Sequence, residues 1–520
     1  MNEDASGLHF NTHEDLHDTT EEITDFTFLP RKKKCSLDPR KMMALTFIAL
    51  ITVGTVLLSS PIAQSSGKWA WFNHSATFSW NHFFSALLDN LFMATSASCV
   101  TGLTVIDVPT YYSTIGHVIL LASIQLGGVS LITLGTLIVT ILLGRVPFGG
   151  EDQVILNYGA KNSSRANSLL AQIVCYVFTF EFLGTVILFF RYYWHHGFTL
   201  GKGLWYSSFH AISAFCNAGI SLHSQNLIPL RNDLIYTSTI ALLVTLGGIG
   251  FLVIANLFRY HPWHLDLRRR GKISLHSRIV LWTSLLLSVG GGIIFTLLEW
   301  NNTLAFIDIG SPLNALFHGE WRELFDSLRH ITQRICSGIS QTAMFRTAGF
   351  NFIEIGEISP PANLLSVFLM LIGGSPGSMA GGIKTTTIVV LFLTIRAYLR
   401  GIPTVEIHQR SISDVICREA MVIVVYYLLM VFAFYFILLL TEKALIAQRG
   451  DFVLFYEVSS AFGTVGTSLN ATPLLSPIGK LVITLAMYLG RIGPISIALM
   501  MAGREVSHRI RYPEETITVG

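Results

Sequence analysis

The segment SASCVTGLTVID (Ser96–Asp107) decides how the fold of this 520-residue chain is interpreted. It places Gly102 among small and β-branched residues beside a hydrophobic stretch, with no catalytic side chain next to it. Because glycine has no Cβ, it reaches backbone conformations that other residues avoid and lets neighbouring carbonyls approach one point. The segment therefore indicates a binding site whose ligands are backbone carbonyls and not side chains.

The phrase around Gly102 has three counterparts further along the chain. The four phrases are CVTGLT (Cys99–Thr104), CNAGIS (Cys216–Ser221), RTAGFN (Arg346–Asn351) and GTVGTS (Gly463–Ser468). Their central glycines, called the filter glycines below, are Gly102, Gly219, Gly349 and Gly466, separated by 117, 130 and 117 residues. One such phrase carries no signal, since small residues let transmembrane helices pack closely. Four at regular spacing are typical of an internally repeated unit.

The composition is that of a polytopic membrane protein. Of the residues, 51% are hydrophobic and 13% are charged. A helix needs about 20 apolar residues to cross a bilayer. Runs of that length predict eight transmembrane spans, near residues 43–63, 114–143, 168–191, 233–258, 277–298, 361–398, 416–441 and 476–502. The six cysteines show no paired spacing and indicate no disulfide framework.

Shorter amphipathic stretches separate the two spans of each successive pair. They cannot cross a bilayer and are predicted to be re-entrant pore helices. The sequence thus predicts an all-α polytopic membrane protein with eight transmembrane helices and four re-entrant pore helices. These form four M1-P-M2 repeats with pseudo-fourfold symmetry around one pore. The repeats comprise residues 43–144, 165–258, 277–400 and 413–503, between a polar N-terminal tail (1–42) and a C-terminal tail (504–520).

The four glycine loops are expected to line one axis. Non-helical backbone at membrane depth must be buried in protein or line a watery cavity, because unsatisfied peptide groups in hydrocarbon are costly. On such an axis, loop carbonyls can replace the hydration shell of a cation, and the pore helices would direct their negative C-terminal ends toward it. The predicted filter residues are Val100, Thr101, Gly102, Asn217, Ala218, Gly219, Thr347, Ala348, Gly349, Thr464, Val465 and Gly466.

The sixth span is interrupted by GGSPGSMAGGIK (Gly373–Lys384). Proline lacks an N–H and glycine is a poor helix former, so this stretch predicts a loop inside the membrane, here called the gate loop (373–383). Such a loop belongs beside the ion path, on the cytoplasmic side of the filter. The predicted gate residues of the loop are Gly373, Gly374, Ser375, Pro376, Gly377, Gly381 and Gly382. Lys384 follows, and either snorkels toward the cytoplasm or takes part in gating.

The distribution of basic residues predicts the topology. An even number of spans places both termini on one side, together with the connections 144–167, 259–279 and 396–418. These segments and the tails hold 22 of the 35 Lys and Arg, so that side is expected to be cytoplasmic. The net charge of +3 reflects this topology and gives no indication of nucleic-acid binding.

Several phrases resemble the membrane subunit of the Trk/Ktr/HKT superfamily of potassium transporters, and the bacterial Ktr type in particular. They are TSASCVTGLTVID (Thr95–Asp107), RTAGFN, EVSSAFGTVGTSLN (Glu457–Asn470), GGSPGSMAGGIKTTT (Gly373–Thr387) and GRIGP (Gly490–Pro494). The resemblance implies potassium as substrate, no covalently bound cofactor, and Na⁺ or H⁺ as a candidate coupling ion for symport. It also implies a homodimer in the lipid of the bacterial inner (plasma) membrane, with a cytoplasmic nucleotide-binding regulatory ring.

The resemblance assigns further residues. A glycine in all four loops goes with potassium preference in this family, so Gly102 favours potassium over sodium. Arg491 matches an arginine of the last span that contributes to the barrier in relatives; here it either repels the ion or pairs with carbonyls at the ends of the gate loop. Ile220 and Met379 depart from the residues common at their positions.

Four acidic residues fall at membrane depth or at its edge. Asp89 and Glu457, in the first and fourth pore helices, are expected to brace the filter in preference to concentrating potassium. Glu181, inside the third span, either pairs with a neighbouring helix or takes part in ion coupling. Glu299 ends the fifth span beside Trp300 and is expected to be solvated.

Two enzyme motifs are rejected, and the chain is predicted not to be an enzyme. HEDLH (His13–His17) matches a zinc-hydrolase motif but lies in a polar tail that cannot provide a rigid helix and pocket. GGSPG (Gly373–Gly377) matches G-x-S-x-G, but an apolar helix precedes it where a strand is needed. The alternative function is a secondary transporter of an organic solute that binds at the broken sixth helix.

Overall fold

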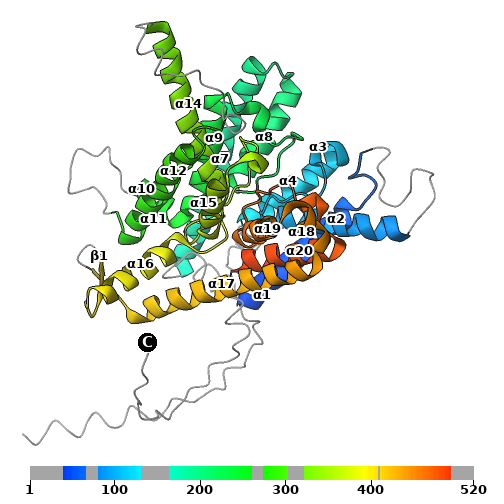
Figure 1. Cartoon of the computed structure of the whole chain (residues 1–520). Helices are drawn as coiled ribbons and strands as arrows, with labels where there is room; N and C mark the ends of the chain where they lie inside the picture. The colour runs from blue at the N-terminus through cyan, green and yellow to red at the C-terminus, as the bar shows by residue number, and fades with distance from the viewer. Residues whose placement is uncertain are drawn as a thin grey trace, which may run out of the picture. The chain divides into compact units, whose positions relative to one another are not determined.

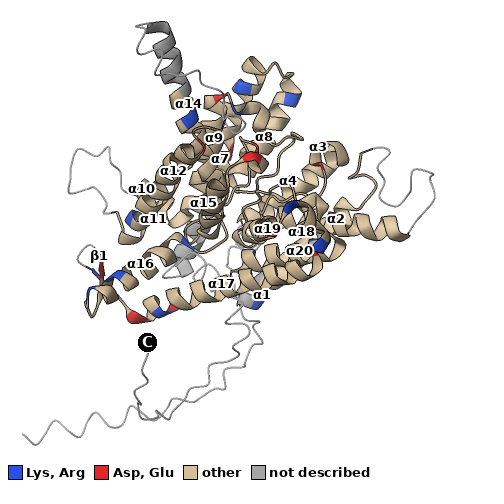
Figure 2. Ribbon diagram, viewed as in Figure 1, with Lys and Arg blue, Asp and Glu red and all other residues tan. Residues whose placement is uncertain are grey.

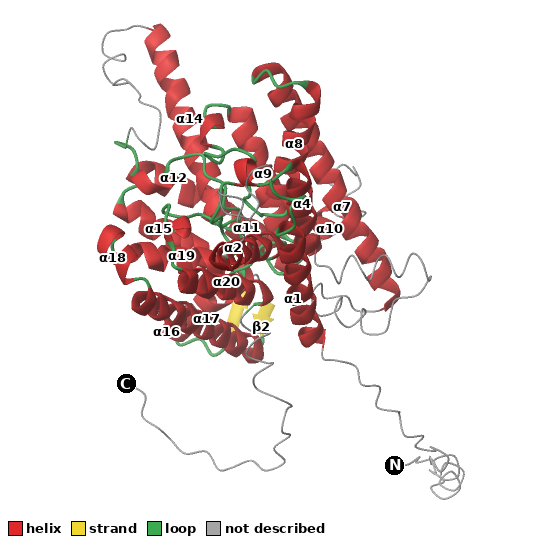
Figure 3. Cartoon of the chain, turned by 90° about the vertical axis from the view of Figure 1, so that its right-hand side faces the viewer, coloured by secondary structure: helices red, strands yellow, loops and turns green. Residues whose placement is uncertain are grey.

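A computed structural model describes residues 39–65, 80–129, 163–259, 273–302, 321–407 and 410–493. Within these ranges the chain is helical except for loops and one antiparallel pair of short strands, β1 (Val405–Ile407) and β2 (Arg410–Ile412) (Figure 1). Figure 3 shows the same dominance of helix from a second direction. The helical, membrane-type fold agrees with the predicted class.

The elements follow the predicted units along the chain. The first unit contains α1 (Pro39–Leu58), α2 (Trp80–Ser98), α3 (Val108–Tyr111) and α4 (Thr114–Val129). The second contains α7 (Ser163–Phe190), η1 (Arg191–His195), α8 (Leu200–Phe215), η2 (Ile228–Leu230), α9 (Leu234–Ile249) and α10 (Phe251–Arg259).

The third unit contains α11 (Leu275–Leu285), η3 (Leu286–Gly290), α12 (Gly291–Leu298), α14 (Trp321–Phe345), η4 (Ile355–Glu357), α15 (Pro360–Leu371) and α16 (Thr385–Leu399). The fourth contains α17 (Asp414–Thr441), α18 (Lys443–Arg449), α19 (Phe452–Gly463), η5 (Thr472–Leu474) and α20 (Pro477–Ile492). The helices α2, α8, α14 and α19 occupy the places of the predicted pore helices.

Three helical segments are long and apolar enough to cross a membrane, namely Gln172–His195, Leu275–Leu298 and Asp414–Thr441, and the bent pair α9 and α10 qualifies as a fourth. Figure 2 shows few charged residues along these helices. Other predicted spans fall on the shorter apolar helices Ala44–Leu58, Thr114–Val129, Pro360–Leu371 and Thr385–Leu399, and the last begins with α20. Residues 130–143 and 494–502 of the predicted spans, the HEDLH motif, residues 1–38 of the N-terminal tail and the whole C-terminal tail lie outside the described residues.

Helix starts after the glycine loops are fixed by local sequence. The Asp233 carboxylate accepts a hydrogen bond from Tyr236 N at 3.1 Å and caps α9. The Ser476 hydroxyl accepts from Gly479 N at 3.1 Å and caps α20, with Pro477 as its first residue. Such caps satisfy N–H groups that have no partner inside the helix.

Each predicted pore helix packs against the spans of its own unit: α2 against α1 and α4, α8 against α7 and α9, α14 against α12 and α15, and α19 against α17 and α20. Glycines make the close approach possible. A methyl group on Gly127, Gly247 or Gly490 would overlap the backbone carbonyl of Ser98, Phe215 or Phe462, respectively, at or near the C-terminal end of a pore helix. The pore helices are therefore held directly against the spans that follow them.

The fourth predicted span is not continuous. It bends by 97° between α9 and α10, at Gly250, whose φ of 96° favours glycine. Beyond the bend, the gate loop takes over the helix hydrogen bonds: Met379 N donates to Gly247 O at 3.2 Å, and Ser375 N donates to Gly248 O at 3.0 Å. The sequence predicted a break in the sixth span only; the structure breaks the fourth as well, where the two breaks meet.

Candidate functional site

The four glycine loops contact one another in a closed ring. Each filter glycine lies against the backbone carbonyl of the residue that precedes the next filter glycine, so closely that a Cβ would overlap the oxygen. The pairs are Gly102 with Ala218, Gly219 with Ala348, Gly349 with Val465, and Gly466 with Thr101. Segments more than a hundred residues apart in sequence thus follow one another around one centre.

The loops share an unusual backbone conformation. In each, φ is positive at the filter glycine and at the residue two positions before it. The values are 57° at Val100, 61° at Asn217, 124° at Thr347 and 49° at Thr464, and 97°, 65°, 69° and 97° at the four filter glycines. A non-glycine residue held in such a conformation costs about 1–3 kcal/mol and is typical of functional sites. Three of the four non-glycine residues are β-branched, for which this conformation is least favourable.

Pore-helix serines hold the loops. The hydroxyl of Ser96 accepts from Gly102 N at 3.0 Å, and that of Ser460 accepts from Gly466 N at 3.0 Å. In the second loop the hydroxyl of Ser213 donates to Ile220 O at 2.8 Å. Each serine lies six residues before its filter glycine. Local sequence in three of the pore helices therefore fixes the loop that follows.

Buried polar side chains of the pore helices also hold the outgoing limbs, meaning the residues that follow each filter glycine. Glu457 accepts from the hydroxyls of Ser468 and Thr472, the latter at 2.7 Å. Gln341 Oε1 accepts from Phe352 N at 2.9 Å. The position of Glu457 agrees with the predicted bracing. Gln341 was not singled out from the sequence, and its offset from the filter glycine is the signal that could have found it.

A cavity of about 650 Å³ opens at the ring on the side of the outgoing limbs. Gly102, Gly219 and Gly466 form part of its wall, together with the carboxyl-bearing residues Asp107 and Glu354. Polar residues complete much of the lining: His223, Ser224, Asn226, Asn351 and Asn470. The ring is thus reached through a polar chamber that carries acidic groups.

The gate loop lies on the fourth loop as well as on the bend in α9 and α10. Its neck is closed by the bonds from Gly373 N to Ile383 O at 2.9 Å and from Ile383 N to Leu371 O at 3.2 Å. Gly381 N donates to Thr464 Oγ1 at 3.1 Å. Because Thr464 is a predicted filter residue, gate loop and ring are in direct contact.

The two predicted gate cations bind backbone carbonyls. Arg491 donates to Met379 O in the gate loop and to Gly127 O at 2.7 Å in α4. This geometry matches the carbonyl-pairing alternative. The Lys384 ammonium donates to Ala380 O at 2.7 Å. Lys384 is therefore bonded within the gate loop and does not extend away from it as snorkelling would require.

The remaining membrane acids are all paired. Asp89 accepts from the Lys480 ammonium at 2.6 Å. Glu181 accepts from Gln125 Nε2, on the neighbouring α4, at 3.2 Å, in agreement with the pairing alternative.

The prediction that Glu299 is solvated is wrong. Glu299 is fully buried and accepts from Ser359 N at 2.8 Å and from Asn302 Nδ2 at 2.6 Å. It holds the first residue position of α15, and the partner Ser359 lies 60 residues away, so a local reading of LLEWNN could not find it.

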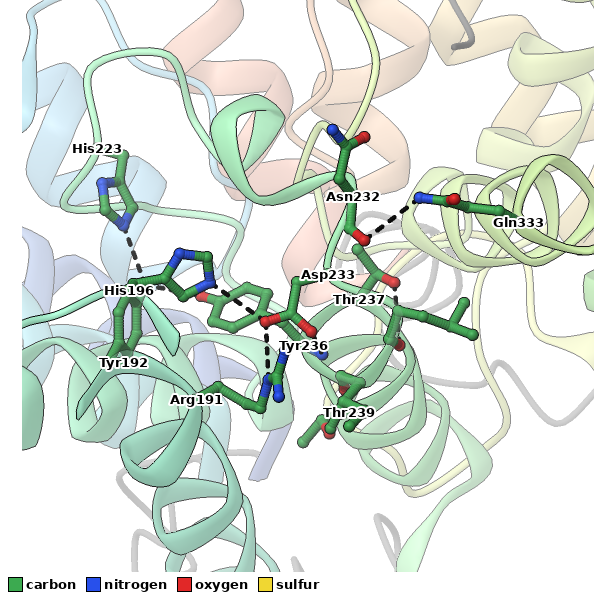
Figure 4. A network of polar contacts seen from close by, with 12 residues as sticks. Arg191, Tyr192, His196, His223, Asn232, Asp233, Tyr236, Thr237, Thr239 and Gln333 are labelled. Carbon is green, nitrogen blue, oxygen red and sulfur yellow. Dashed lines mark hydrogen bonds and ion pairs between the residues drawn. The ribbon is translucent and has the colours of Figure 1, made fainter. Parts of the chain in front are cut away.

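A polar network at the end of η1 was not foreseen (Figure 4). Asp233 Oδ2 accepts from Arg191 Nε at 2.8 Å and lies 3.2 Å from His196 Nε2. His195, His196 and Asp233 bring potential metal ligands within 4.8 Å of one another. Because Arg191 already occupies the carboxylate oxygen, this arrangement is an ion-pair network at the start of α9.

Ser375, the candidate nucleophile of the rejected GGSPG motif, is fully buried. Its hydroxyl accepts from Thr385 at 3.4 Å. Within the described ranges, no histidine or carboxylate is bonded to it. The motif is part of the gate loop and lacks the partners of a catalytic serine.

Comparison with known proteins assigns the chain to a family. The model of the family TrkH, described as a cation transport protein, matches residues 56–508. The chain is 30% identical over 496 residues to the potassium/sodium uptake protein NtpJ of Enterococcus hirae, covering 95% of this chain and 100% of that one. It is 32% identical over 485 residues to the Ktr system potassium uptake protein B of Bacillus subtilis, covering 93% and 97%.

The fold has a counterpart among solved structures. The crystal structure of the potassium transporter TrkH from Vibrio parahaemolyticus matches with a TM-score of 0.63, covering 90% of this chain and 86% of that one. The sequences are 14% identical, so this match concerns the fold alone.

Proposed function

The chain belongs to the TrkH family of cation transport proteins, and we propose that it moves potassium ions into the cell through the ring formed by its four glycine loops. As a member of this family it is a multi-pass membrane transporter and not an enzyme. The names of the relatives quoted above, which are potassium uptake proteins, support potassium as the ion.

The observation that carries the proposal is the closed ring of filter glycines. In this account the carbonyls of the twelve predicted filter residues replace the water around a potassium ion. Each glycine lies against the carbonyl of the next loop, and this order supports four M1-P-M2 repeats arranged with pseudo-fourfold symmetry around one pore. The polar cavity beside the ring would serve as the outer entrance, where Asp107 and Glu354 favour cations.

The gate loop, with Lys384 and Arg491, closes the path on the cytoplasmic side in this account. Support comes from its contact with Thr464 and from the bonds of Arg491 to carbonyls of two different segments. Arginine donates through a rigid planar group, so it holds the gate loop and α4 in one geometry. Opening would require these bonds to be exchanged.

The proposal extends to partners and location. The chain would act as a homodimer in the lipid of a bacterial inner membrane, with both termini cytoplasmic and a nucleotide-binding regulatory ring bound there. Relatives named as parts of a Ktr system motivate the ring. A relative named for potassium and sodium motivates a test of Na⁺ coupling, with H⁺ as the other candidate for symport.

Rubidium uptake tests the proposal. The chain is expressed in cells that lack their own potassium transporters, and uptake of rubidium is measured with sodium as competitor. The account predicts saturable rubidium uptake that excess sodium does not abolish. If no uptake occurs, the measurement is repeated with a candidate ring subunit. Absence of uptake in both conditions would contradict the proposed function.

A further inference from the structure

His210, in the pore helix α8, is fully buried behind the second glycine loop. Its Nδ1 lies 2.8 Å from Tyr206 O, and its Nε2 lies 3.3 Å from Leu222 N and 3.0 Å from the Ser221 hydroxyl. A carbonyl can only accept and a backbone N–H can only donate. The partners of His210 therefore assign it as the neutral imidazole with its proton on Nδ1.

This tautomer holds the outgoing limb of the second loop. Ser221 and Leu222 directly follow Gly219 and Ile220, and the Ser221 hydroxyl in turn accepts from His223 N at 3.0 Å. An imidazolium carries protons on both nitrogens. After protonation, Nε2–H would face Leu222 N–H, and the limb would lose its acceptor in a buried site.

A short relay connects His210 to the cavity. His223 lines the cavity, and its Nε2 lies 2.9 Å from the Tyr192 hydroxyl (Figure 4). That hydroxyl lies 3.4 Å from His210 Nδ1 and 2.9 Å from the Tyr236 hydroxyl. The two imidazole rings are also stacked, with centroids 5.3 Å apart. One tyrosine hydroxyl thus joins a cavity-lining histidine to the histidine that holds the loop.

The surroundings keep this pair of histidines neutral at ordinary pH. Burial, with the charges of Lys202 and His196, lowers the pKa of His223 to about 4. The other titratable groups that face the pair are the phenols of Tyr192 on η1, Tyr206 on α8 and Tyr236 on α9. Among the residues that the structure describes, no carboxylate is bonded to either imidazole. A proton bound here would remain uncompensated.

The fourth loop shows which part of this arrangement is special. Glu457 lies nine residues before Gly466 and accepts from Ser468, two residues after it. His210 and Ser221 have the same offsets from Gly219. A protonated carboxyl still offers a carbonyl oxygen as acceptor, whereas an imidazolium offers none. Of these two loops, the second is the one that a proton releases.

We propose that neutral His210 is a positioning residue for the second filter loop, and that acid on the cavity side weakens potassium-over-sodium discrimination through His223, Tyr192 and His210. The inference rests on the proposed function, because it assigns the loop to a filter. As pH falls toward 4, His223 gains its proton first, and the loop that depends on His210 follows.

The test measures the ratio of rubidium to sodium uptake at external pH of about 7.5 and about 4.5, a range in which histidine changes its charge. Both ions carry the same charge, so changes in membrane potential cancel in the ratio. The variants are His210→Gln, which keeps an acceptor but does not titrate, and His223→Gln. His117→Gln is the control, because His117 is half-buried on α4 and bonded to Val108 O, outside the relay.

For the wild type and for His117→Gln, the ratio should fall by about threefold or more at acid pH, since histidine becomes charged there. For His210→Gln it should stay the same at both values, and for His223→Gln the fall should be smaller than in the wild type. If His210→Gln does not reach the membrane, His210→Glu, which copies Glu457, takes its place. A wild-type ratio that is independent of pH, or a His210→Gln ratio as sensitive as the wild type, would overturn the inference. A wild type without discrimination at pH of about 7.5 would instead contradict the proposed function.

Discussion

The guanidinium of Arg491, near the end of α20, donates a hydrogen bond to the backbone carbonyl of Met379 in the gate loop. A second nitrogen of the same group donates to Gly127 O at 2.7 Å. One side chain therefore joins the last helix, the gate loop and α4. The sequence alone left open whether this arginine repels the ion or binds carbonyls, and the geometry makes it a clamp.

Removing the clamp should open the path. In Arg491→Gln the charge-assisted bonds, worth about 1.5–3 kcal/mol, are lost, and basal rubidium uptake should rise about tenfold, as expected for about 1.4 kcal/mol. The measurement is initial uptake at equal surface expression. Arg396→Gln, in the last turn of α16, is the control and should leave uptake unchanged. Unchanged uptake in Arg491→Gln would show that the clamp does not limit transport.

The bend between α9 and α10 should depend on Gly250. Its φ is 96°, and a Cβ there would lie 2.8 Å from Pro376 O in the gate loop. Gly250→Ala should therefore destabilise the protein by about 1–3 kcal/mol, seen as a lower thermal midpoint in detergent. Gly201→Ala, where a Cβ meets no atom within 4 Å, is the matched control. Equal midpoints for the two variants would mean that the bend imposes no conformational requirement at Gly250.

Burial of Glu299 predicts a structural role for it. Replacing it with alanine leaves Ser359 N–H and Asn302 without their acceptor, which should cost about 1–3 kcal/mol of stability. Thermal unfolding of Glu299→Ala against Glu357→Ala, whose side chain is exposed, gives the comparison. If both variants unfold at the same temperature, the buried carboxylate does not support α15.

The sequence predicted the elements of the site better than their contacts. The four glycine loops, the pore helices that precede them and the break at Pro376 all follow from local composition and spacing. The pairing of each filter glycine with the next loop does not, because it joins residues more than a hundred positions apart. The same holds for Glu299, whose partner Ser359 is distant in sequence.

The bend at Gly250 was missed for a different reason. LGGIG (Leu246–Gly250) is apolar and rich in small residues, so it was interpreted as part of a continuous span. Comparison of the units would have been more informative. LGRIG (Leu489–Gly493) in the last span has the same pattern, and its Gly493 also has a positive φ, of 89°.

The central claim is that the glycine ring selects potassium, and Gly102→Ser tests it most directly. Its side chain would meet the carbonyl of Ala218 and a backbone with φ of 97°, so the ring geometry must change. We expect the variant to reach the membrane and to transport, with a rubidium-to-sodium uptake ratio reduced about tenfold, equivalent to about 1.4 kcal/mol. Gly201→Ser should keep the wild-type ratio. A Gly102→Ser protein that transports with the wild-type ratio would contradict the account.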